Sequence, residues 1–150
     1  MFDFKFDWCK EMECGIEIID EQHQELFRII RGIEQLIMNG CKNVTQKQLL
    51  DIVCELREYI SYHFYTEENL MGRFQYPKLA AHMAQHLDLK DYILNIDMPL
   101  LAKEPVQVLT ALKEHMQNYL FNHILQEDYN LCLFLAPYAE TGVLIPQAIS

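Results

Sequence analysis

The sequence has few basic residues and no long apolar run. Its 150 residues contain 12 Lys and Arg against 22 Asp and Glu, a formal net charge of −10. This charge repels phosphate backbones and anionic lipid surfaces, so we expect neither nucleic-acid nor membrane partners. No run reaches bilayer length, and acidic residues interrupt residues 1–15, which therefore lack the apolar centre of a signal peptide. The sequence predicts a soluble, cytoplasmic protein.

Closely spaced cysteine pairs are also absent. The five cysteines are Cys9, Cys14, Cys41, Cys54 and Cys132. An odd number without any C-x-x-C pair predicts neither a disulfide framework nor a thiolate zinc site. We therefore expect reduced thiols that pack as small apolar side chains.

Glycine and proline are scarce, with five of each, and they punctuate long amphipathic stretches. Apolar residues at steps of three and four predict four helices, which begin at Asp20, Thr45, Pro77 and Pro105. Short connections force neighbouring helices to run antiparallel. The chain length and a hydrophobic content of 51% suit one core. We expect a single all-α domain over residues 1–150, with an up-down-up-down antiparallel four-helix bundle at about 20–130.

The two ends of the chain lack a sustained helical period. In the arm at residues 1–19, aromatic and charged residues alternate, which predicts an extended segment whose aromatic face packs over the ends of the bundle; the aromatic residues are Phe2, Phe4, Phe6 and Trp8. In the C-terminal extension at residues 131–150, Pro137, Gly142 and Pro146 argue against another long helix. This apolar tail either packs on the bundle or forms a subunit contact, so a monomer and a homo-oligomer both stay open.

Ionisable residues interrupt the apolar stripes of all four predicted helices: His23, His63, Glu67, His82, His86, His123 and Asp128. Buried ionisable groups are costly unless they are paired or bind a metal. In an antiparallel bundle, these positions meet at one end. Imidazole and carboxylate groups without thiolates suit iron, manganese or zinc, and this set exceeds the needs of one tetrahedral zinc. The pattern predicts two metal ions bridged by the carboxylates.

One ligand spacing does not fit a regular helix. His123 and Asp128 are five residues apart, which separates them by about 140° at 3.6 residues per turn. Either Asp128 reaches the site from the side, or the helix widens there into a π-like turn.

The ordered motifs H, H-x-x-x-E, H-x-x-x-H and H-x-x-x-x-D, running from His23 to Asp128, closely resemble those of the hemerythrin family and its single-domain bacterial members. Trp8 and the stretch GIEIIDEQHQELF also look like that family. The resemblance implies a non-haem di-iron centre with an oxo or hydroxo bridge. It implies that His82, His86 and His123 bind one iron, that His23 and His63 bind the other, and that Glu67 and Asp128 bridge both. The second iron keeps an open position for dioxygen.

Four apolar residues flank ligands of the first and fourth helices: Leu26, Phe27, Leu120 and Ile124. We predict that they form the walls of a dioxygen pocket that excludes water, although each also suits ordinary core packing. His115 matches no ligand of the family, and we expect it on the flank or surface of its helix.

The resemblance implies reversible dioxygen binding for storage or delivery inside the cell, with an oxygen-consuming enzyme as a candidate recipient. One alternative is a sensor of oxygen, redox state or nitric oxide that signals through a partner. A di-iron oxidase or peroxidase is less favoured, because ferritin-like oxidative centres contain more carboxylates. We therefore expect a binding protein and not an enzyme.

Overall fold

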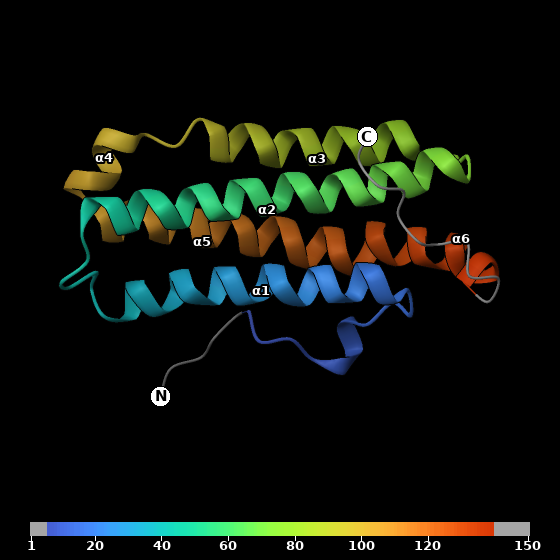
Figure 1. Ribbon diagram of the computed structural model, residues 1–150, viewed down its shortest axis with the longest axis horizontal. Coiled ribbons are helices and arrows are strands. Elements are labelled where there is room, and N and C mark those ends of the chain that lie inside the picture. The colour runs from blue at the N-terminus through green and yellow to red at the C-terminus, as the bar shows by residue number, and fades with distance from the viewer. Residues whose placement is uncertain (1–5, 140–150) are drawn as a thin grey trace.

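The computed structural model describes residues 6–139, which form helices and short connections without any strand. The four long helices are α1 (Glu17–Met38), α2 (Gln46–Arg73), α3 (Leu79–Leu94) and α5 (Pro105–Asn122). Figure 1 shows them lying side by side along the long axis of the molecule, with α1 against α2 and α5, and α2 against α3. The all-α prediction is confirmed. No helix within residues 6–139 is both long and apolar enough to cross a bilayer.

Local capping explains where several helices begin. The Thr45 hydroxyl accepts a hydrogen bond from the Gln48 amide at 3.1 Å, and the Gln48 side chain accepts one from the Thr45 amide at 2.8 Å. This reciprocal pair is a capping box that starts α2. Pro105 is the first residue of α5, where its missing N–H costs nothing.

The predicted start of α1 at Asp20 is wrong. The helix begins at Glu17, and the Asp20 carboxylate instead accepts hydrogen bonds from the amides of Cys14, at 2.9 Å, and Gly15, at 3.1 Å. Gly15 has a φ of +92°, which favours glycine. Asp20 therefore lies in the first turn of α1, and its side chain stabilises the turn that precedes the helix.

Two segments outside the four predicted helices are also helical. The connection between the third and fourth predicted helices contains α4 (Met98–Lys103), and the Asp97 carboxylate caps it at 2.9 Å from the Leu100 amide. Part of the predicted extension is α6 (Tyr129–Ala139). Pro137 lies within the described part of this helix and does not prevent it, although proline removes one backbone donor. Gly142 and Pro146 lie outside the described residues.

The N-terminal arm packs along the flank of the bundle, not over its ends. The buried Phe6 ring lies 5.5 Å from Phe27 on α1 and 5.7 Å from Phe121 on α5, measured between centroids. Trp8 lies 5.4 Å from Phe27. A short 3₁₀ helix, η1 (Lys10–Met12), then leads to α1. Phe2 and Phe4 lie outside the described residues.

The buried apolar residues form two groups. The larger one follows the bundle, and the smaller one, called the end cluster here, lies where α6 meets the start of α1 and the end of α2. Its buried members are Ile16, Ile19, Leu70, Met71, Tyr76, Leu131, Cys132 and Leu135. α6 therefore extends the core past the end of α5.

Cys14 and Cys132 form a disulfide, which corrects the prediction that all five cysteines are reduced thiols. The two residues are 118 positions apart in sequence, and the fold brings their Cα atoms to 5.8 Å. Spacing rules detect only pairs that are close in sequence, so they miss this one. Cys9, Cys41 and Cys54 are free thiols, as predicted.

Candidate metal centre

A π-helix joins α5 to α6 over His123–Asp128, called the π-segment below. Its i to i+5 hydrogen bonding places residues five apart one turn above each other. His123 Nε2 accordingly lies 2.9 Å from Asp128 Oδ1. The predicted π-like turn is confirmed, and a regular helix with Asp128 entering from the side is excluded.

The structure brings together all seven predicted ligands, and all are buried. Their ligand atoms form two groups, in each of which all atoms lie within 4.8 Å of one another. One group contains Glu67, His82, His86, His123 and Asp128, and the other contains His23, His63, Glu67 and Asp128. The two carboxylates belong to both groups.

Glu67 directs one oxygen to each group of histidines. Its Oε1 lies 3.2 Å from His82 Nε2 and 3.0 Å from His86 Nε2. Its Oε2 lies 3.1 Å from His63 Nε2 and 3.5 Å from His23 Nε2. The carboxylate thus lies between the two groups.

Asp128 divides its oxygens in the same way. Its Oδ1 lies 3.0 Å from His82 Nε2 and 2.9 Å from His123 Nε2, whereas Oδ2 lies 2.9 Å from His23 Nε2. Two carboxylates that each face both groups are suited to bridging two cations.

Several of these atoms have no hydrogen-bond partner despite their short distances. They are His23 Nε2, His123 Nε2, Glu67 Oε2 and both Asp128 carboxylate oxygens. Unsatisfied buried polar atoms are rare and costly in proteins, and bound cations would satisfy this set of nitrogen and oxygen donors. The residues therefore fit a pair of metal ions.

In the absence of metal, the buried histidines and carboxylates of the site strongly shift one another's pKa values. Burial lowers the pKa of His23, but the carboxylates of Asp128 and Glu67 overcome this effect and raise that pKa to about 9. The same opposing causes raise the pKa of His82 to about 10. Burial raises the pKa of Glu67, but His63 and the other nearby histidines hold it well below its usual value. Metal ions at this site would have to displace histidine protons.

Two glutamines bond to the rings of predicted histidine ligands, and no motif in the sequence singles them out. His63 Nδ1 donates to Gln22 Oε1 at 2.8 Å, and Gln22 Nε2 donates to the Thr66 hydroxyl at 3.1 Å. His123 Nδ1 donates to Gln85 Oε1 at 2.7 Å. These bonds place the proton on Nδ1 and leave Nε2 free for a metal. Each glutamine directly precedes a predicted histidine ligand in the sequence, but it bonds to a histidine on a different helix. The position next to a histidine is therefore the only signal of these residues in the sequence.

Replacing Gln22 with leucine should weaken metal binding by about 10-fold to 100-fold, because the His63 ring loses the acceptor that fixes its orientation. Gln24→Leu is the matched control, since Gln24 lies two residues away on the exposed face of α1. Competition with a chromophoric chelator measures the affinity. Equal affinities of the two variants would show that Gln22 does not orient His63.

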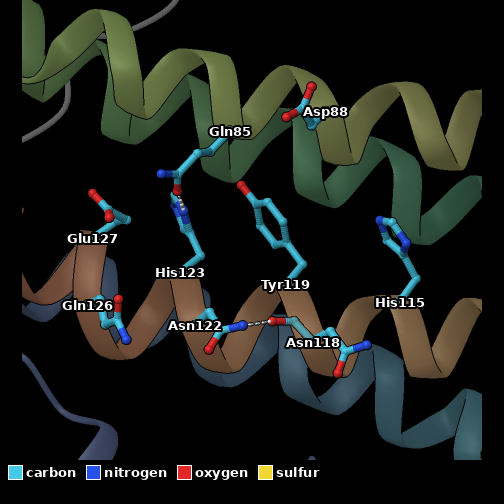
Figure 2. A pocket seen from close by; sticks show the side chains of 9 residues that line it. All are labelled: Gln85, Asp88, His115, Asn118, Tyr119, Asn122, His123, Gln126 and Glu127. Carbon is cyan, nitrogen blue, oxygen red and sulfur yellow. Dashed lines mark hydrogen bonds between the residues drawn. The ribbon is translucent and has the colours of Figure 1, made fainter.

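A cavity of about 570 Å³ opens between α3 and α5 beside His123. Figure 2 shows Gln85 pointing from α3 to His123, with Tyr119 and His115 farther along α5. The Tyr119 ring stacks on His123 with centroids 5.0 Å apart, and its buried hydroxyl lacks a hydrogen-bond partner. His115 stacks on Tyr92 at 3.7 Å and lines the cavity, so it lies on the helix flank, as predicted.

The four predicted pocket walls are buried in the larger apolar group: Leu26, Phe27, Leu120 and Ile124. Phe27 also contacts Phe6 and Trp8 of the arm. Their packing is compatible with a dry lining, and a role in dioxygen binding stays a prediction.

Comparison with known proteins agrees with this donor set. The family model of the hemerythrin HHE cation binding domain matches residues 14–132, which include all seven side chains. The bacteriohemerythrin of Clostridium acetobutylicum is 27% identical over 123 residues, which cover 82% of this chain and 95% of that protein. Bacteriohemerythrins of Aquifex aeolicus, 29% identical over 121 residues (79% of this chain, 88% of that protein), and Methylococcus capsulatus, 26% identical over 125 residues (82% and 92%), are also similar. The chain belongs to the hemerythrin family.

Proposed function

We propose that this protein binds dioxygen reversibly at a non-haem di-iron centre and so stores or delivers oxygen. The observation that carries the proposal is the unequal division of the histidines. Three of them, His82, His86 and His123, share one side of the carboxylates, and only His23 and His63 share the other. With fewer protein donors, the second metal ion keeps a coordination position for an external ligand.

In this proposal, Glu67 and Asp128 would bridge two irons beside an oxo or hydroxo bridge, and the histidines on each side of the carboxylates would bind the nearer iron. The oxygen positions of both carboxylates support these roles. Ferrous ions held by these residues would supply the electrons for oxygen binding. The protein excludes water and holds each imidazole with its Nε2 toward the centre.

The proposal also includes one domain over residues 1–150 and an up-down-up-down order of the four long helices. Its support is the packing of α1 against α2 and α5 and of α2 against α3, together with short connections. That order brings the start of α1 and α3 to the end of α2 and the π-segment, where the seven side chains lie.

A reversible spectrum is the direct test. Anaerobic protein loaded with ferrous iron is exposed to oxygen and then deoxygenated, and we expect an absorption band that appears and disappears with about two irons per chain. Irreversible oxidation with release of a product would support an oxidase or peroxidase instead. Reversible binding that alters association with a partner protein would favour a sensor. A preparation that binds one zinc and no iron would contradict the proposal.

Replacing Leu120 with alanine should speed autoxidation of the oxygenated protein, because the smaller side chain admits water to the proposed pocket. We expect an increase of about tenfold, at a cost of about 2–5 kcal/mol in stability for a buried Leu→Ala change. Leu112→Ala is the matched control, because Leu112 is equally buried on α5 but lies two turns farther from the π-segment. The decay of the oxygenated band measures the rate. An autoxidation rate equal to that of the control would assign Leu120 to core packing alone.

A further inference from the structure

The disulfide between Cys14 and Cys132 lies at the same end of the molecule as the candidate metal centre. Cys132 is one helical turn beyond Asp128, in α6, and Cys14 lies just before α1, which carries His23. Neither cysteine is part of the donor groups. The bond therefore crosslinks the segments that flank two ligands without taking part in the site.

The end cluster connects this disulfide to the ligands through packing. Ile19 lies one turn before His23, Leu70 lies about one turn after Glu67, and Leu131 follows Asp128 at a similar distance. Cys132 is buried in the same cluster as these three residues. A displacement of Cys132 would therefore disturb the packing next to ligands on three different segments.

The disulfide crosslinks α6 to the segment before α1. One face of α6 also packs in the end cluster, whereas Tyr129 and Leu133 on its outer face are 47% and 58% exposed. The turn containing Cys14, by contrast, is held independently by its hydrogen bonds to Asp20. Opening the disulfide should consequently loosen α6 more than the turn before α1.

The two sulfurs also differ in access. Cys14 is half-buried, whereas Cys132 is 1% exposed. A dissolved thiol reaches the Cys14 sulfur first, and access helps to decide which sulfur of a disulfide is attacked.

We propose that Cys14 and Cys132 form a reversible thiol–disulfide exchange site for small thiols, whose redox state sets how firmly α6 and the π-segment hold Asp128 in the centre. The part that concerns metal retention rests on the proposed function. The exchange chemistry and the loosening of α6 do not.

The exchange is balanced with a small thiol, RSH, as the reductant. Its thiolate attacks Cys14 Sγ, the bond between the two cysteines breaks, and Cys132 leaves as a thiolate that takes up a proton. A second thiolate then attacks the sulfur of the small thiol in the mixed disulfide, so that RSSR is released and Cys14 leaves as a thiolate that takes up a proton. Two RSH are oxidised to RSSR as one protein disulfide is reduced to two thiols, and RSSR reverses the sequence.

Metal-free protein tests the exchange site directly. Full-length chain is equilibrated in glutathione buffers of rising reducing strength, alkylated and mapped by mass spectrometry. We expect Cys14 and Cys132 to become alkylated together and reversibly, and any trapped glutathione adduct to lie on Cys14. Cys9 should be alkylated throughout, because it is a free, exposed thiol. Alkylation of Cys14 and Cys132 under all oxidising conditions, or a bond that glutathione never opens, would overturn the proposal.

Hydrogen exchange tests the coupling to α6. Amides of the π-segment and α6 should exchange about tenfold faster in the reduced metal-free protein than in the oxidised protein, because local opening becomes easier. Amides in the middle of α2 should be unaffected. Identical exchange rates of these amides in both states would show that the disulfide does not influence the segment that carries Asp128, and the proposal would be rejected.

Iron retention tests the last step with variants, so that no thiol reductant has to be added to the iron-loaded protein. Cys14→Ser should release iron to a chelator about tenfold faster than wild type, whereas the control Cys9→Ser should match wild type. Equal release rates for all three proteins would overturn the coupling. If no variant binds iron, the proposed function fails, and the alkylation and hydrogen-exchange results still decide the thiol chemistry.

Discussion

Glu67→Gln should lower the iron content from about two ions per chain to fewer than one. The Glu67 carboxylate faces four histidines, with Oε1 near His82 and His86 and Oε2 near His23 and His63. An amide of the same shape carries no negative charge, and its nitrogen does not bind a cation. The substitution therefore removes the proposed bridge between the two ions while it preserves the volume of the buried side chain.

Glu58→Gln is the matched control for this experiment. Glu58 lies on the exposed face of the same helix, α2, and belongs to neither donor group. We expect this variant to keep both irons. Metal analysis and the reversible oxygen band provide the measurement, and circular dichroism checks that both variants are helical. Two irons in Glu67→Gln would show that Glu67 does not bridge them.

An alanine inserted after Gln126 should abolish the paired centre, whereas deletion of Gln126 should preserve it. The π-segment accommodates one residue more than a regular turn, and this is why ligands five apart share a face. Deletion leaves His123 and Asp128 four apart, which places them on one face of a regular α-helix. Insertion places them six apart, about 240° round a regular helix.

Gln126 suits this comparison because it is exposed and is not a ligand. The two variants change the length of the same segment by one residue in opposite directions, so each controls for the other. Iron content and disulfide formation by Cys132 are measured together, since the register of α6 follows that of the π-segment. Loss of iron from the deletion variant would mean that the wide turn does more than place Asp128.

Local sequence signals account for much of the fold and for the composition of the site. The capping box at Thr45 and the proline at the start of α5 determine helix starts through bonds to nearby residues. The five-residue spacing of His123 and Asp128 indicates a π-turn for the same local reason. Predictions failed where a distant contact decides the outcome: Asp20 bonds the turn before α1, and α6 forms beyond the predicted bundle by burying one face in the end cluster.

By itself, the sequence determined which imidazole and carboxylate groups interrupt the apolar faces, and near which end of each helix they lie, because helical periodicity is a property of neighbouring residues. Only the tertiary structure decided how Glu67 and Asp128 divide their oxygens, which glutamines hold His63 and His123, and that Cys14 meets Cys132. These contacts depend on how each helix is rotated and shifted relative to its neighbours. Packing of side chains throughout the core determines that placement.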